Sequence, residues 1–124
     1  MPEKPNSYDL SMIKQYLELP MLLSIIESNI ITTKNHFRIP QMFSLHLTTL
    51  QDRISMDLKN TKVAMSRHGI KVYEECREAD RVTCKYLCRG YHGEMSLLWG
   101  KVQSDLEVKL ANYMNLKTEE LSRV

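Results

Sequence analysis

The chain has 124 residues, of which 43% are hydrophobic and 26% are charged, and its formal net charge is +2. This length suits one domain with a single core, and the composition argues against wholesale disorder. The longest apolar run, Leu19–Leu23, is far shorter than the roughly 20 residues that span a bilayer. Residues 1–6 also lack the features of a secretory signal. We therefore expect no membrane partner and a cytoplasmic location.

The chain divides into three parts along its length. We expect a flexible N-terminal tail at residues 1–7, a single compact domain at 8–116 and a frayed C-terminal turn at 117–124. Three cysteines are an odd number with no disulfide-framework spacing, which indicates reduced thiols in a cytosol.

The first predicted helix runs from Tyr8 to about Asn35. Asn6 or Ser7 can cap its start, because either side chain can accept a hydrogen bond from an unpaired backbone amide. Pro20 lacks the amide that a helix needs, so we expect either one kinked helix or two helices. The apolar stripe that indicates this helix consists of Leu10, Ile13, Leu17, Leu22, Ile26 and Ile30.

A long second helix is predicted from Pro40 to Arg67, and Gly69 just beyond it is a typical stop signal. Met42 and Met56 lie off its apolar stripe, which indicates a helical dimer seam, unless these methionines fill gaps in an irregular core. We expect a homodimer. The stripe consists of Phe43, Leu47, Leu50, Ile54, Leu58, Thr61 and Met65.

After Gly69 the apolar residues alternate in twos, which predicts a β-hairpin of residues 70–76 and 82–89. In the simplest antiparallel register every facing pair is apolar except Glu74, which faces Cys84. A helix through 70–88 is the alternative, because this segment also contains good helix formers. The apolar pairs are Ile70 with Cys88, Val72 with Tyr86, and Cys76 with Val82.

Gly90-Tyr91-His92-Gly93 is expected to be a loop before a last helix from about Glu94 to Asn115. Gly100 inside that helix suggests that a neighbouring backbone approaches closely. The predicted fold class is therefore α+β and predominantly helical, in the order α-α-β-β-α. It has a kinked first helix, one long central helix, a β-hairpin and a C-terminal helix, whose apolar face is Leu98, Val102, Leu106, Leu110 and Tyr113.

The positive charge is concentrated in the middle of the chain. Residues 34–91 carry a net charge of +5, whereas the two flanking segments together carry −3. A long helix before a basic hairpin loosely resembles a winged helix-turn-helix, whose hairpin contacts phosphates. The alternative is an ordinary solvated face. The candidate residues for binding a partner or nucleic acid are Arg81, Lys85, Arg89, Tyr91 and His92.

Cys76, Cys84, Cys88 and His92 are four potential zinc ligands, and Cys3His is a legitimate tetrahedral set. On a strand, however, Cys84 and Cys88 would lie roughly 13 Å apart, too far to share an ion. Their three-residue gap is not a redox motif, although Cys76 and Cys84 could meet diagonally across the hairpin. We therefore expect inert thiols, no metal and no cofactor.

No phosphate-binding loop, nucleophile elbow or metalloprotease motif is present in the sequence. We assign no catalytic residue and expect a small, non-enzymatic intracellular protein that acts through protein–protein contact. It would be an interaction or regulatory factor that self-associates and has an unidentified protein partner. The alternative is a nucleic-acid-binding protein that uses the basic β-hairpin.

Overall fold

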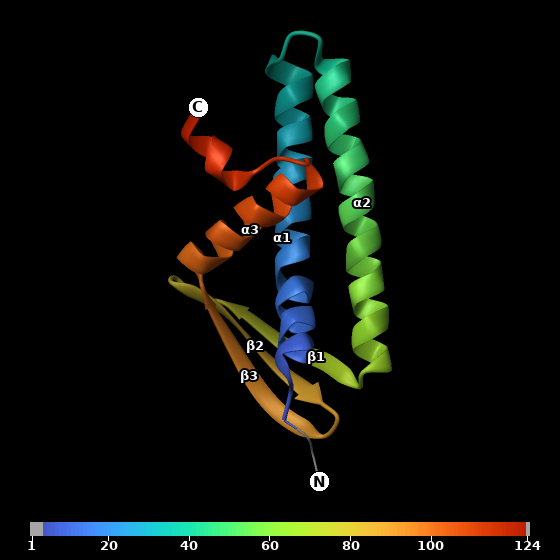
Figure 1. Cartoon of the computed structure of the whole chain (residues 1–124), viewed down its shortest axis with the longest axis vertical. Coiled ribbons are helices and arrows are strands. Elements are labelled where there is room, and N and C mark those ends of the chain that lie inside the picture. Colours follow the sequence, from blue (N-terminus) through green and yellow to red (C-terminus); the bar gives the residue numbers. More distant parts are fainter. Residues whose placement is uncertain (1–3, 124) are drawn as a thin grey trace.

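The computed structural model describes residues 4–123, apart from the side chain of Ser122. Two long helices, α1 and α2, form a hairpin; a three-stranded sheet lies at one end of it, and α3 lies against α1 (Figure 1). The predicted fold class, α+β and mostly helical, is confirmed. The elements are α1 (Ser7–His36), α2 (Pro40–Arg67), β1 (Ile70–Arg77), β2 (Arg81–Cys88), β3 (Tyr91–Leu98), α3 (Trp99–Tyr113) and the 3-10 helix η1 (Thr118–Arg123).

α1 is one continuous helix of 30 residues with Pro20 inside it, so the two-helix alternative is not observed. The Asn6 side chain accepts from the Asp9 amide at 2.8 Å, and the Asp9 carboxylate accepts from the Asn6 amide at 3.0 Å. This reciprocal capping box fixes the start of the helix and confirms Asn6 as the cap. The predicted apolar stripe is buried from Ile13 onward, whereas Leu10 is 36% exposed.

α2 buries the central part of its predicted stripe against α1, including Leu50, Ile54 and Met65. Phe43, at the start of that stripe, is 51% exposed. The prediction that it is buried is wrong because Phe43 lies beside the α1–α2 turn. Figure 1 shows this turn at the end of the molecule opposite the sheet, beyond the reach of α3.

The sheet has a third strand, which the sequence analysis missed. β2 and β3 are joined by Arg89-Gly90, with φ of 48° and 87°, the two positive values of a type I′ hairpin turn. The predictions of a loop at Gly90–Gly93 and a helix from Glu94 are therefore wrong, and α3 begins at Trp99. Asn or Gly usually precedes Gly in this turn. Because Arg89 stands at that position, the sequence does not show the usual pattern of a type I′ turn.

The strands pair in the order β1-β2-β3, all antiparallel. The predicted pairs of Ile70 with Cys88 and Val72 with Tyr86 are confirmed, but the register then shifts by one residue at a β-bulge. Cys76 therefore faces Thr83, not Val82. The bulge also removes the misfit of Glu74 with Cys84, because Glu74 now faces Lys85.

The core has two parts, one among the three helices and one where α1 and the end of α2 pack on the sheet.

Gly93 and Gly100 differ in the space that each leaves for a side chain. A Cβ on Gly93 would lie 2.5 Å from the Tyr86 hydroxyl oxygen, whereas a Cβ on Gly100 would have no atom within 4 Å. The predicted close approach at Gly100 is therefore wrong. Position 93 is the one that must be glycine, because any larger residue would overlap the Tyr86 side chain.

The two ends of the chain are described only in part. Of the predicted tail at 1–7, residues 1–3 lie outside the described residues, while Asn6 and Ser7 belong to the start of α1. Of the predicted frayed turn at 117–124, Thr118–Arg123 forms η1 and residue 124 lies outside the described residues.

Candidate functional site

The basic side chains predicted on the hairpin all form ion pairs within the molecule. Arg81 lies 2.9 Å from Asp80, and Lys85 lies 3.2 Å from Glu74 across the β1–β2 ladder. Both pairs are exposed, so solvent screening leaves each with little effect on stability. Their partners nevertheless offset much of the positive charge that the sequence places on this face.

Arg89 has a structural role that the sequence analysis did not predict. It lies in the turn after β2, and its guanidinium reaches Asp9 of α1 at 2.6 Å and the His68 carbonyl at 2.8 Å. Asp9 is only 1% exposed, and the hydrogen bond from Arg89 lowers the pKa of this buried carboxyl. Arg89 therefore joins the β2–β3 turn, the start of α1 and the end of α2.

Tyr91 and His92 lie on opposite faces of the sheet, because neighbouring residues in a strand point in opposite directions. Tyr91 packs against the core beneath the sheet. His92 is exposed on the outer face, where its ring centroid lies 6.1 Å from that of Tyr73. The structure thus does not gather the five predicted binding residues into one site, and their binding role stays a prediction.

The potential zinc ligands are also divided between the two faces. Cys84 and Cys88 are buried, whereas Cys76 and His92 are exposed on the outer face. Cys76 faces Thr83 and its neighbour Glu75 faces Cys84, so Cys76 and Cys84 cannot meet diagonally. Burial raises the pKa of the Cys84 thiol to about 11, which makes it unreactive at neutral pH. Within residues 4–123, no three His, Cys, Asp or Glu side chains are placed to hold a metal.

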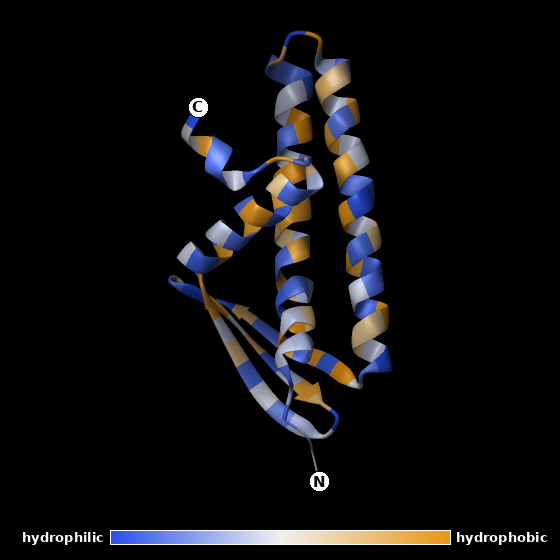
Figure 2. Ribbon diagram, in the orientation of Figure 1, coloured by the Kyte–Doolittle hydropathy of each residue, from blue (hydrophilic) through white to orange (hydrophobic). Residues whose placement is uncertain are grey.

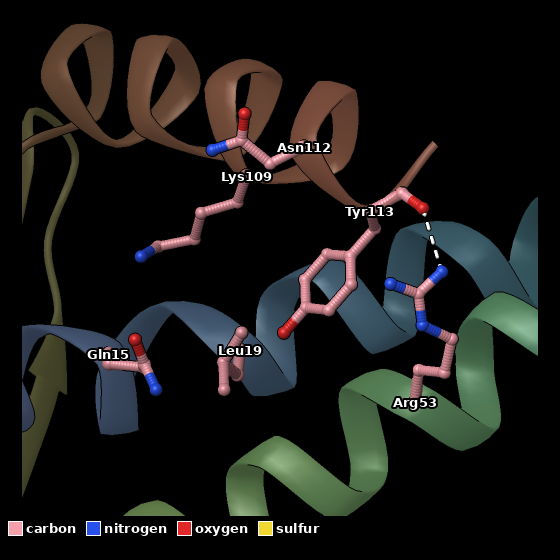
Figure 3. A pocket seen from close by; sticks show the side chains of 6 residues that line it. All are labelled: Gln15, Leu19, Arg53, Lys109, Asn112 and Tyr113. Carbon is pink, nitrogen blue, oxygen red and sulfur yellow. Dashed lines mark hydrogen bonds between the residues drawn. The ribbon is translucent and has the colours of Figure 1, made fainter. Parts of the chain in front are cut away.

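A shallow pocket of about 320 Å³ lies where α3 meets α1 and α2 (Figure 3). Arg53 donates to the Tyr113 carbonyl oxygen at 2.9 Å on one side, and the Tyr113 hydroxyl lies 2.5 Å from the Asp57 carboxylate. These polar groups hold the end of α3 against α2. Because they already bind one another, the pocket presents few open groups to a ligand.

Beside this pocket, Glu18 is fully buried between α1 and α3. The Lys109 ammonium lies 3.7 Å from its carboxylate, which is beyond hydrogen-bond distance. Burial raises the pKa of Glu18 to about 7, and the nearby Asp105 carboxyl adds to this rise. Asp105 itself pairs with Lys14 at 2.7 Å and Lys101 at 3.2 Å.

The sequence analysis missed this charged contact between α1 and α3. The only local signal is that Glu18 lies between Leu17 and Leu19 in an otherwise apolar segment. No spacing in the sequence links it to Asp105, which belongs to a helix whose start was misplaced.

The outer edge of β3 is the most regular open feature of the sheet. β3 pairs with β2 at all eight positions without a bulge, and within residues 4–123 no strand pairs with its other side. It contains no proline and one acidic residue, Glu94. Such an edge presents a row of main-chain donors and acceptors to another strand.

These features define a class of protein: a long helical hairpin packed on a three-stranded antiparallel meander, in which Arg81, Lys85 and Arg89 are each paired with a carboxylate. The chain belongs to the family described as YhjD protein, whose model matches residues 4–118. No curated protein and no solved structure matches the chain significantly. Among the residues that the structure describes, no helix combines the length and hydropathy needed to cross a bilayer.

Proposed function

We propose that this chain is a non-enzymatic cytoplasmic interaction factor that self-associates by pairing the β3 strands of two copies. The observation that carries this proposal is the regular, uncovered edge of Tyr91–Leu98. Two such edges would pair in antiparallel fashion and give one six-stranded sheet. This mode of association uses main-chain hydrogen bonds and needs no special side chains.

β3 is better suited to this role than β1, the other edge of the sheet. The bulge between Val72 and Glu74 interrupts β1, and bulges are a common means of blocking edge-to-edge association. In β3, by contrast, Glu94 is the only acidic residue and there is no Lys or Arg, so two copies would bring together little like charge.

The ion pairs of Arg81, Lys85 and Arg89 favour this proposal over a hairpin that binds nucleic acid. Phosphate binding draws its affinity from cations that neutralise the backbone. Here each of the three cations already neutralises a carboxylate, so binding would first have to replace those contacts.

Hydrogen exchange measured at low and high protein concentration tests the proposal. We expect light scattering to detect dimers in the micromolar range, and the amides of residues 91–98 to become more protected as the dimer forms. The amides of 70–77 in β1 serve as an internal control and should not change. A monomer at every concentration would contradict the proposal.

A pair of proline substitutions at neighbouring positions sharpens this test. Successive amides in a strand point to opposite edges, so of Met95→Pro and Ser96→Pro one removes a bond to β2 and the other removes only an outward amide. The variant that keeps its fold by circular dichroism should be monomeric. If that variant still dimerises, β3 is not the interface.

A further inference from the structure

The turn between α1 and α2 leaves large apolar side chains uncovered at the end of the molecule. We define the tip as residues 34–46. Phe37, Ile39, Met42 and Phe43 are between 48% and 69% exposed, and the Phe37 and Phe43 rings lie 5.4 Å apart, edge to face. Figure 2 shows hydrophobic residues in this turn, away from both parts of the core.

The charge around these apolar side chains has a single sign. No acidic residue occurs between Glu27 and Asp52, whereas the tip contains Lys34, Arg38 and two histidines. Among the residues described, neither Lys34 nor Arg38 forms an ion pair with a carboxylate. This is the reverse of the hairpin, where each predicted cation has an acidic partner.

The backbone at the tip adds two features. Ile39 adopts a left-handed conformation with φ 53° and ψ 54°, which is unfavourable for a β-branched residue. Ile39 is also the residue before α2, and no side chain caps that helix with a hydrogen bond. The negative end of the α1 dipole lies at the same tip and opposes the positive end of α2, so the positive charge of the tip comes from Lys34 and Arg38.

We infer that the tip docks on an anionic lipid surface, with Phe37, Ile39, Met42 and Phe43 at the headgroup–acyl boundary and Lys34 and Arg38 among the phosphates. A bilayer surface offers both an apolar layer and negative charge to a convex tip. A second copy of the tip would bring like charges together, so charge argues against tip-to-tip pairing.

This contact is separate from the proposed β3 dimer and does not depend on it. It also departs from the expectation of no membrane partner, which considered only membrane-spanning and secretory segments. Figure 1 places the tip at the far end of the hairpin from the sheet, so nothing in the described chain blocks its approach to a flat surface. Since few apolar side chains would insert, binding should be reversible and strongly dependent on salt.

Vesicle flotation of the full chain tests the inference. We expect binding to phosphatidylcholine vesicles that contain 30% phosphatidylglycerol, little binding to pure phosphatidylcholine, and loss of binding at high salt. The double variant Lys34→Glu, Arg38→Glu should weaken binding by at least about 25-fold, because each base near an anionic surface contributes about fivefold. Its control is Lys59→Glu, Lys62→Glu, which changes net charge equally on exposed positions of α2 away from the tip.

The apolar contribution is tested with Ile39→Asn. Asn tolerates the left-handed conformation, so this variant should fold at least as well and bind about fivefold to tenfold more weakly. Met56→Ser is the control, because Met56 is similarly exposed on α2 but lies outside the tip. The inference is wrong if the wild-type chain does not float with anionic vesicles, or if the tip variants bind as well as their controls. Capture of an acidic protein by the tip with no vesicle binding would also overturn it.

Discussion

The two ends of the molecule offer different kinds of surface. At the sheet end the three cations Arg81, Lys85 and Arg89 are paired with carboxylates, and the β3 edge leaves main-chain groups open. At the tip the backbone is mostly helical, and apolar and basic side chains are open. The sheet end is therefore suited to another strand, and the tip to a surface that is both apolar and anionic.

This difference shows that a short segment rich in chemically reactive side chains need not form a binding or catalytic site. The segment Cys84–Glu94 holds cysteines, tyrosines, bases and a histidine, yet the fold uses most of them for packing and ion pairing. The tip has no recognised motif, but Phe37, Ile39, Met42 and Phe43 are exposed there beside two bases that form no ion pair with a described residue.

The largest expected effect is on the pH dependence of stability. It arises from Glu18, the buried carboxyl at the contact between α1 and α3. The pKa of Glu18 is about 7 in the folded chain, above its usual 4.5. The unfolded chain therefore loses this proton first as pH rises. The free energy of unfolding should fall between about pH 4.5 and 7 and level off above, by up to about 3 kcal/mol.

Glu18→Gln should remove most of this pH dependence and make the chain more stable than the wild type at pH 8. Urea unfolding at pH 5 and pH 8 measures both effects. Glu107→Gln, on the exposed side of the same helix contact, is the control and should follow the wild-type profile. An unchanged profile in Glu18→Gln would show that this carboxyl does not titrate as the structure implies.

The next largest effect distinguishes buried from exposed ion pairs at the sheet end. Arg89→Ala leaves the buried Asp9 carboxylate without its cation, and we expect a loss of about 2 to 3 kcal/mol in unfolding free energy. Arg81→Ala removes a pair in which both side chains are exposed and should leave the free energy of unfolding almost unchanged. Equal effects in denaturant titrations would contradict the assignment of Arg89 as a structural residue.

A smaller contrast separates the two glycines. Gly93→Ala should destabilise the chain by about 2 kcal/mol, because the added methyl group overlaps the buried Tyr86 side chain. Gly100→Ala should stabilise it by up to about 1 kcal/mol, because α3 gains a better helix former in open space. Thermal unfolding of both variants should therefore shift in opposite directions.

The smallest effect on stability is expected at the tip. Met42→Ser and Arg38→Gln should change the free energy of unfolding by no more than about 0.5 kcal/mol, since exposed positions contribute little to folding. Ile54→Ala, in the buried centre of α2, should cost roughly 3 kcal/mol. A large loss in the tip variants would mean that these side chains support the fold and are not available to a partner.

The sequence predicted the two long helices because their apolar residues repeat three or four apart over many turns, and Asn6, Pro40 and Gly69 mark their ends. It also predicted the first hairpin, including two of its facing pairs. It could not predict the bulge after Val72, because a one-residue insertion leaves the alternation on either side intact. It missed β3 because Arg89 stands where a type I′ turn usually has Asn or Gly.

The candidate surfaces were harder to predict than the fold. Whether Arg89 is open to a ligand depends on Asp9, which lies 80 positions earlier in the chain. The exposure of Phe43 depends on where α3 crosses the helical hairpin. The spacing of apolar residues in α2 gives no information about that position. To predict either the pairing of Arg89 or the exposure of Phe43, one must know how elements that are distant in the sequence lie relative to one another.

Hydrogen exchange of the whole chain, with and without anionic vesicles, tests the contrast between the two ends most directly. We predict that vesicles increase the protection of residues 34–46 and leave 81–92 unchanged, while a higher protein concentration protects 91–98 and leaves the tip unchanged. Protection of 81–92 by vesicles, with no change at the tip, would contradict the account.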